Sequence, residues 1–253
     1  MKKNIIALIP SRLKSNRLPF KALLPINKIP MVIHVYYRTL LAKSIKDVII
    51  CTCDNKIINT CKKYKSKAIL TSKKHVNGTE RIYEAYKKLK KKFDLIIDVQ
   101  GDEPLINPHH IDQVVNFHLK NLDADIILPN LNYALNDNKN IVKLVANNKN
   151  EVMYLSRGEV PVGFGKRVKY GKKHLSIISF KPKALEKFAK SKMSELEKIE
   201  GIELLRALEL GLKIKTFSLK GDSFSVDVLK DYKKAKIKMK NDKFLKIYKK
   251  NLK

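Results

Sequence analysis

A cluster of positive charge in segment 9–21 is the first feature of the sequence that could do chemistry. Arg12, Lys14, Arg17 and Lys21 follow a short apolar run, and two prolines stiffen the loop that holds them. Arginine forms bidentate hydrogen bonds to phosphate oxygens, and lysine adds a compact point charge. The pattern Gly-x-x-x-x-Gly-Lys is missing, so this is no Walker P-loop. We therefore expect a loop that grips a triphosphate, with a solvated basic loop as the alternative.

An acidic turn follows a strongly apolar segment. Residues 95–99 are an expected strand, and the segment 100–104 (Gln-Gly-Asp-Glu-Pro) comes directly after it. Mg²⁺ prefers one or two carboxylates together with phosphate oxygens and water. Asp102 is therefore a candidate metal ligand, although a Gly-Asp pair alone indicates only a turn. Its position beyond a strand end, opposite the basic loop, favours the metal interpretation.

The segment 77–81 (Asn-Gly-Thr-Glu-Arg) stands at an expected helix start. Asn77 or Thr79 can cap this helix, and Glu80 then lies in the first turn, where a negative charge is favourable. A functional interpretation has the backbone of this loop recognise the edge of a pyrimidine, with Arg81 reaching a phosphate or a carboxylate. The two interpretations are compatible, so the sequence leaves both open.

Short apolar strands alternate with amphipathic helices, which is typical of a parallel sheet covered on both faces. In such an open sheet, ligands bind beyond the carboxyl ends of the strands. Strands are expected at 4–9, 48–52, 68–70, 95–99, 126–128, 175–180 and 214–219. Helices are expected from about Pro30 and at 55–64, 79–92, 108–120, 182–190, 195–210 and 228–239, and a lysine-rich tail is expected to fray.

Length and composition favour one domain, 1–253. The 44% of hydrophobic residues suffice for a core. From about 132 to 173 the pattern changes to short Asn-rich segments, which predicts a small inserted lobe that packs on a second subunit of a homodimer. No stretch of about 18 apolar residues and no secretory signal is present, so we expect a cytoplasmic protein. Cys51, Cys53 and Cys61 lack the further ligands of a zinc site, so we expect packed, reduced thiols.

Positive charge dominates the chain, because 54 Lys and Arg against 24 Asp and Glu give a formal charge of +30. Such a field attracts polyanions, and a basic nucleic-acid-binding protein is therefore one alternative. The excess is mostly lysine, scattered in pairs on helix faces such as 87–92, without zinc-finger spacing or an aromatic RNA-binding strand. This favours solvated surfaces and an anionic small substrate over dedicated nucleic-acid binding.

The motifs occur in an order that resembles a known enzyme family. The loop PSRLKSNRLPFK, then NGTER and VQGDEP, are similar to the 3-deoxy-manno-octulosonate (Kdo) cytidylyltransferases, the CMP-Kdo synthetases. The similarity continues through YLSRGEVP, KHLSIISF, LEKIEGIELLRALELG and SVD, and so spans nearly the whole chain. It implies an α/β, Rossmann-like nucleotidyltransferase with a mostly parallel mixed sheet and a small inserted dimerisation lobe. It also implies transfer of CMP from CTP to the anomeric hydroxyl of Kdo for lipopolysaccharide synthesis, with Mg²⁺ as cofactor and pyrophosphate as by-product.

The resemblance assigns roles to individual residues of this chain. The implied catalytic residues are Lys21, Arg12 and Asp102, and the implied metal ligands are Asp102 and Asp227. The implied nucleotide-binding residues are Arg12, Arg17, Lys21, Asn77, Gly78, Thr79, Arg81 and Gln100. The implied sugar-binding residues are Gln100, shared with the nucleotide, Arg157, His174 and Glu203. Without the family context, His174 is most simply a satisfied histidine at the start of a strand.

Three places depart from the family pattern on the sugar side. Ile178 stands where a tyrosine is usual, Leu204 where a glutamine is usual, and Val162-Gly163 where an aromatic and a polar residue are usual. These changes remove hydrogen-bonding groups and leave the nucleotide side intact. The alternatives are therefore a transferase for a modified Kdo such as 8-amino-Kdo, or for a nonulosonic acid, and, in another class, an inactive nucleotide-binding homologue. The sequence leaves open which sugar acid is used and whether one or two Mg²⁺ ions act.

Overall fold

The computed structural model describes residues 3–135, 138–165 and 168–252, and the chain divides into two compact units. Unit 1 comprises Met1–Gln113 and Ser223–Lys253, and unit 2 comprises Val114–Asp222. Helix α4 (Pro108–Lys120) carries the chain from the first unit into the second. Both ends of the chain therefore belong to unit 1. In the three described stretches, no helix has the length and apolar character needed to cross a membrane.

Unit 1 is built on parallel strands in the order β6-β1-β4-β5. β1 (Ile5–Ser11) lies between β6 (Leu95–Val99) and β4 (Asp47–Thr52), and β5 (Ala68–Leu70) pairs with β4. Every side chain of β1 is buried. Because successive side chains of a strand point to opposite faces, both faces of this sheet are covered. Cys51 in β4 is a fully buried free thiol, and burial raises its pKa.

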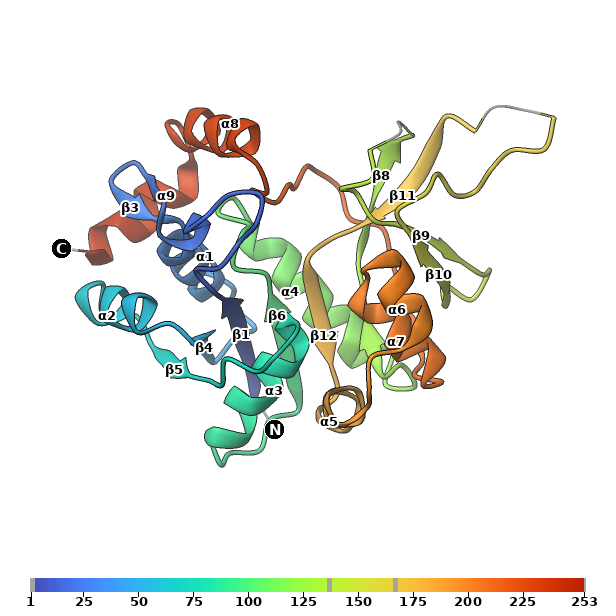
Figure 1. Cartoon of the computed structure of the whole chain (residues 1–253), viewed down its shortest axis with the longest axis horizontal. Coiled ribbons are helices and arrows are strands. Elements are labelled where there is room, and N and C mark those ends of the chain that lie inside the picture. Colours follow the sequence, from blue (N-terminus) through green and yellow to red (C-terminus); the bar gives the residue numbers. More distant parts are fainter. Residues whose placement is uncertain (1–2, 136–137, 166–167, 253) are drawn as a thin grey trace. The chain divides into compact units, whose positions relative to one another are not determined.

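Helices of unit 1 cover this sheet, and α1 and α3 both pack on β1 and β4 (Figure 1). The remaining elements of unit 1 are the 3₁₀ turn η1 (Lys21–Leu23), β2 (Pro25–Ile26), β3 (Ile29–Pro30), α1 (Met31–Leu40), α2 (Asn55–Lys63), α3 (Gly78–Lys88), α8 (Leu229–Met239), α9 (Lys243–Tyr248) and η2 (Lys249–Leu252). α3 ends four residues earlier than expected, because Lys90 takes a left-handed conformation with φ 51°. Pro30 precedes α1 as its N-cap and is not its first residue.

The C-terminal tail is helical, so the expectation that it frays is wrong. α9 packs on α1, far from it in sequence (Figure 1). The buried Arg38 donates to Asp242 Oδ1 at 2.6 Å, and the Tyr248 hydroxyl lies 2.5 Å from His34 Nδ1. The lysines of the tail flank an apolar face that the sequence analysis overlooked, and this face anchors the tail.

Unit 2 contains a short mixed sheet with helices. β7 (Ile126–Ile127) pairs in parallel with β13 (Ile214–Lys215) and antiparallel with β12 (Ile177–Phe180). Its helices are α5 (Pro182–Lys190), α6 (Glu195–Glu200) and α7 (Glu203–Glu209). The single helix expected at 195–210 is thus two helices. Gly201 causes the break, because it caps α6 in a left-handed conformation with φ 61°.

The segment in which a lobe was predicted forms an antiparallel sheet of its own. Its order is β10-β9-β11-β8, which joins β8 (Asn130–Ala134), β9 (Lys143–Ala146), β10 (Val152–Ser156) and β11 (Tyr170–His174). Residues 136–137 and 166–167 of the predicted lobe lie outside the described residues. Buried and exposed side chains mix along β8 and β10, so this sheet is less completely buried than strand β1 of unit 1.

Candidate active site

Three charged side chains from distant parts of unit 1 converge at one point. The Lys21 ammonium donates to Asp102 Oδ2 at 2.7 Å, to Asp227 Oδ1 at 3.0 Å and to the Val226 carbonyl at 3.1 Å. Arg17 donates to the same Asp227 oxygen at 2.9 Å. Arg17, Lys21 and the two aspartates were predicted to belong to one site, and the structure brings these four side chains together.

Backbone and side-chain bonds tie the two aspartate loops to each other. The Val226 N–H donates to the Asp102 carbonyl at 2.8 Å. The Ser223 hydroxyl donates to the carboxylate of the buried Glu103 at 2.6 Å. Because both bonds join residues more than a hundred positions apart, the chain holds the two carboxylates in a fixed relation through its fold.

Two glycines allow the predicted site segments to meet at Pro10. A Cβ on Gly101 would lie 2.7 Å from the Pro10 carbonyl oxygen, which is closer than real Cβ contacts. A Cβ on Gly78 would lie 3.2 Å from Pro10 Cγ and 3.6 Å from Gln100 Nε2. The end of β1, the start of α3 and the turn after β6 are therefore in contact, as expected for loops at the carboxyl edge of a parallel sheet.

The charge of Lys21 is secured by its neighbours. Burial alone would lower the pKa of Lys21, because desolvation disfavours the ammonium. The carboxylates of Asp102 and Asp227 outweigh this effect and hold the pKa above its ordinary value. The side chain is only 17% exposed. Lys21 therefore keeps its positive charge in a partly buried environment.

The loop before α3 has the capping role that the sequence predicted. The Asn77 side chain accepts from the Glu80 N–H at 2.9 Å, and Thr79 is buried in the first turn. Arg81 was expected to reach a phosphate or a carboxylate. In the structure its guanidinium is buried and donates instead to the Thr71 hydroxyl at 2.8 Å and to a neighbouring carbonyl. Arg81 therefore braces the loop from inside.

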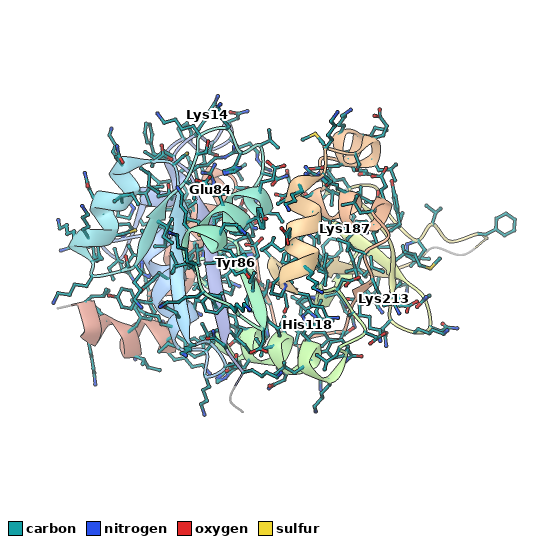
Figure 2. The ribbon with its side chains drawn as sticks, turned by 90° about the horizontal axis from the view of Figure 1, so that it is seen from below. Lys14, Glu84, Tyr86, His118, Lys187 and Lys213 are labelled. Carbon is teal, nitrogen blue, oxygen red and sulfur yellow. The ribbon has the colours of Figure 1, made fainter. Side chains whose placement is uncertain are left out.

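Glu84 anchors the same loop from α3 and was missed by the sequence analysis (Figure 2). Its carboxylate accepts from the Ser72 N–H at 2.8 Å, contacts the His75 ring and pairs with Lys88 at 2.7 Å. Burial would raise the pKa of Glu84, but these three partners lower it to about 2. The i,i+4 spacing of Glu84 and Lys88 was visible in the sequence, and the loop contacts were not.

Gln100 and Arg12 complete the predicted nucleotide side. Gln100 is half-buried after β6, and its amide donates to Asp98 Oδ2 at 2.9 Å. Arg12 directly follows β1 and is exposed. Gln100 is therefore oriented by the buried Asp98, which the sequence analysis did not single out.

His174, at the end of β11 in unit 2, is a neutral imidazole. Burial, together with the positive charges of Arg157 and Lys173, lowers its pKa to about 4. Its Nδ1 lies 3.2 Å from the Leu175 carbonyl. Because a carbonyl only accepts, Nδ1 carries the proton and Nε2 is left as an acceptor.

Arg157 directs its guanidinium at backbone carbonyls. Nε donates to the backbone carbonyl of Glu200 at 2.8 Å, Nη1 to that of Lys139 at 3.0 Å and Nη2 to that of Gly201 at 3.2 Å. The Glu200 carboxylate in turn accepts from the Arg157 N–H at 2.8 Å and from the Ser156 hydroxyl at 2.9 Å. Arg157 was predicted to bind the sugar, and no role was predicted for Glu200. In the structure the two residues clamp the end of β10 to the turn between α6 and α7.

Lys143 is a second cation of unit 2 that the sequence analysis missed. Its ammonium is fully buried and donates to the carbonyls of Arg157 at 2.6 Å, Asn138 at 3.1 Å and Ile141 at 3.2 Å. The Glu159 carboxylate lies 3.4 Å away. A lysine within a strand gives no signal of such burial, because lysine is usually exposed. Lys143 thus fixes the segment that carries Arg157.

The other predicted sugar-side positions lie near the α6–α7 turn and on β12. Glu203 is the first residue of α7 and is half-buried. Ile178 and Leu204, which depart from the family pattern, are both buried. Their apolar side chains therefore belong to the packing of unit 2 and add no polar group there.

Comparisons with known proteins find similar chains of one enzyme family. A family model described as cytidylyltransferase matches residues 6–214. An 8-amino-3,8-dideoxy-manno-octulosonate cytidylyltransferase from Shewanella baltica is 36% identical, over 94% of this chain and 100% of that protein. A 3-deoxy-manno-octulosonate cytidylyltransferase from Thermodesulfovibrio yellowstonii is 36% identical, over 91% of this chain and 96% of that protein.

A solved structure gives the same result for the fold. CMP:2-keto-3-deoxy-manno-octonic acid synthetase in complex with CTP matches with a TM-score of 0.85 and 28% identity, over 93% of this chain and 98% of that one. This confirms the predicted α/β nucleotidyltransferase fold with a mostly parallel sheet. The resemblance drawn from the motifs is confirmed as well, and the chain is a nucleotidyltransferase. It belongs to the cytidylyltransferase family.

Proposed function

We propose that this enzyme transfers CMP from CTP to the anomeric hydroxyl of Kdo, releasing pyrophosphate and giving CMP-Kdo. The observation that carries the proposal is the convergence of Lys21, Asp102 and Asp227 at one point. Such a cluster of opposite charges, next to a basic loop, suits a metal-bound triphosphate. The relatives named for Kdo and 8-amino-Kdo support the choice of sugar acid.

The residues of unit 1 would act on the nucleotide. Arg12, Arg17 and Lys21 bind the triphosphate and neutralise the charge that moves to the departing pyrophosphate. The loop of Asn77, Gly78 and Thr79 receives the cytosine, and Gln100 contacts both substrates. The sugar hydroxyl attacks the α-phosphorus in line, a reaction that depends mainly on positioning and charge neutralisation.

Asp102 and Asp227 fit a divalent cation such as Mg²⁺. Both carboxylates bond to one positive centre, the Lys21 ammonium, at 2.7 and 3.0 Å. A single small cation can therefore be reached by both, and Mg²⁺ accepts two carboxylates with phosphate oxygens completing its shell. When bound, the ion polarises the phosphate oxygens as a Lewis acid.

The residues of unit 2 would hold the sugar acid. His174 is neutral and offers Nε2 as an acceptor for a sugar hydroxyl. Glu203 begins α7 and can accept from further hydroxyls. Arg157 contributes its positive charge and, through its bonds to Glu200 and Gly201, the position of the turn before Glu203. Polyol recognition by neutral and acidic acceptors fits this set.

A second candidate substrate is 8-amino-Kdo, because the relatives at 36% identity include enzymes named for it. The buried Ile178 and Leu204 also differ from the pattern of Kdo enzymes. Pyrophosphate release with CTP, Mg²⁺ and a panel of Kdo, 8-amino-Kdo and a nonulosonic acid tests the proposal. We expect the highest kcat/KM with Kdo. A clear preference for 8-amino-Kdo would make it the substrate in place of Kdo. No release of pyrophosphate with any of the acids would contradict the proposed activity.

We further propose a cytoplasmic homodimer. CTP is a cytoplasmic metabolite, and unit 2 exposes the large apolar side chains Met153, Val162, Phe164 and Tyr170 along its antiparallel sheet and the following loop. Large exposed apolar side chains within one segment support a protein interface there. The mass of the particle in solution tests this, and a monomer at micromolar concentration would contradict it.

A further inference from the structure

The Lys21 ammonium has its full set of partners inside unit 1. An ammonium carries three N–H donors, and Lys21 meets three acceptors: Asp102 Oδ2, Asp227 Oδ1 and the Val226 carbonyl. The two carboxylates come from loops that are themselves tied together by the Val226 N–H and the Asp102 carbonyl. Lys21 therefore bonds to both aspartates, whereas Arg17 pairs with Asp227.

The same two carboxylates are the proposed ligands of the metal, so two cations compete for the negative charge of one pair of carboxylates. Like charges at a few ångströms repel strongly in a partly buried site. Lys21 is 17% exposed and Asp227 is 17% exposed, so solvent screens this repulsion only weakly. A divalent ion can use both aspartates only if the ammonium gives up its bonds to them.

A triphosphate offers the ammonium other anionic oxygens. Lys21 lies in the η1 turn at the end of the basic loop, on a flexible side chain of four methylene groups. The side chain can exchange partners without any change in the backbone that holds Asp102 and Asp227. Binding of nucleotide and binding of metal would then favour each other, because each removes a cost of the other.

We propose that Lys21 is an exchangeable counter-ion, which keeps free divalent cations from the aspartate pair and releases it when CTP binds. The inference rests on the proposed function. It adds that the metal binds together with the nucleotide and that Lys21 sets this order. Lys21 thus selects the nucleotide-bound metal over the free ion, in addition to its contact with the phosphates.

The test is a titration of the nucleotide-free protein with Mn²⁺, followed by the electron paramagnetic resonance signal of the free ion. We expect Lys21→Met, which keeps the length of the side chain and removes its charge, to bind Mn²⁺ about tenfold more tightly or better. Lys21→Gln should behave in the same way. Lys230→Met is the matched control, since it removes an exposed lysine three residues after Asp227, and we expect wild-type affinity.

The second arm repeats the titration with CTP present. CTP should strengthen Mn²⁺ binding in the wild type by a larger factor than in Lys21→Met, because the variant has no ammonium to displace. Circular dichroism confirms that each variant is folded. Equal Mn²⁺ affinity of wild type and both Lys21 variants would overturn the inference. If CTP also failed to strengthen Mn²⁺ binding in the wild type, the metal site of the proposed function would fail with it.

Discussion

Units 1 and 2 hold their functional cations in different ways. In unit 1, Lys21 and Arg17 pair with the side chains of Asp102 and Asp227. In unit 2, the cations bond mainly to backbone carbonyls, as the three guanidinium bonds of Arg157 show. Side-chain pairs can exchange partners when a charged ligand arrives, whereas backbone bonds fix the local fold. The difference suggests that unit 1 is built to rearrange charge and unit 2 to present a fixed surface.

Lys21 in unit 1 and His174 in unit 2 also differ in protonation state. The carboxylates beside Lys21 keep its pKa high, whereas burial keeps the pKa of His174 low, at about 4. A permanent ammonium suits a triphosphate, and a neutral imidazole suits the hydroxyl groups of a sugar. The two sites therefore match the two substrates of the proposed reaction.

The largest expected effect comes from the exchangeable charges of unit 1. Asp102→Asn or Asp227→Asn should lower turnover about a thousandfold or more, because each removes one carboxylate from the proposed metal site. Thermal unfolding should change little, since both residues lie in partly exposed loops. Pyrophosphate release under saturating CTP and sugar acid measures the loss.

Asp94→Asn is the matched control for this pair. Asp94 is an exposed aspartate of unit 1 that accepts from the Asn4 N–H at 2.7 Å and lies outside the proposed site. We expect its turnover to equal that of the wild type. Near-normal CMP transfer by either site variant would refute the metal assignment and reduce the charge cluster to a structural ion pair.

Unit 2 also contains a buried ion pair between two side chains, and its effect should appear in the free energy of unfolding. Arg206 is buried and donates to both oxygens of the buried Glu197 at 2.5 and 2.8 Å, with its guanidinium over the Phe188 ring. Arg206→Met should lower the free energy of unfolding by about 3–5 kcal/mol, because it leaves a carboxylate buried beside an apolar side chain. Urea unfolding measures this.

A double variant sharpens the result. Arg206→Met combined with Glu197→Leu removes both charges of the buried pair and should regain much of the lost stability. Arg38→Met tests whether breaking a buried ion pair costs stability in unit 1 as well, since Arg38 pairs with Asp242 at 2.6 Å. A loss below about 1 kcal/mol for Arg206→Met would mean that the pair contributes little and that unit 2 owes its rigidity to apolar packing.

The parallel strands and the meeting of Lys21 with Asp102 could be predicted from the sequence for a physical reason. A short, mostly apolar run such as 95–99 favours a buried strand, and the loops after parallel strands meet at one edge of the sheet. Charged residues in those loops, such as Lys21 and Asp102, have no packing role to compete with. Their convergence therefore followed from composition and topology alone.

The supports of the site could not be predicted in the same way. Lys143, Glu200 and Glu84 act through bonds to backbone atoms that are distant or set by turn geometry, and a single residue type does not encode such partners. The break at Gly201 was present as a helix-ending glycine inside an acidic run, and its left-handed φ is what separates α6 from α7. Helical periodicity around it concealed the signal.

The smallest expected effect concerns a feature that the two units share. His34 in unit 1 and His118 in unit 2 (Figure 2) are fully buried, and desolvation lowers the pKa of each to about 4. In each ring Nε2 lies near a backbone carbonyl oxygen. The distance is 2.8 Å from His34 to Ile26 and 3.3 Å from His118 to Ala124. That nitrogen carries the proton, so the other accepts from a hydroxyl and both rings are neutral.

Acid should therefore destabilise both units alike. As the pH falls below about 6.5, a histidine in the unfolded chain binds a proton while the buried one does not until about pH 4, so the folded state loses stability across this range. The difference corresponds to about 3 kcal/mol for each histidine. The free energy of unfolding, measured with urea between pH 7 and 4, should depend less on pH in His34→Gln and in His118→Gln than in the wild type. The exposed His109→Gln should show the same pH dependence as the wild type. If only one of the two buried variants flattened the curve, the units would differ in acid sensitivity as well as in how they hold charge.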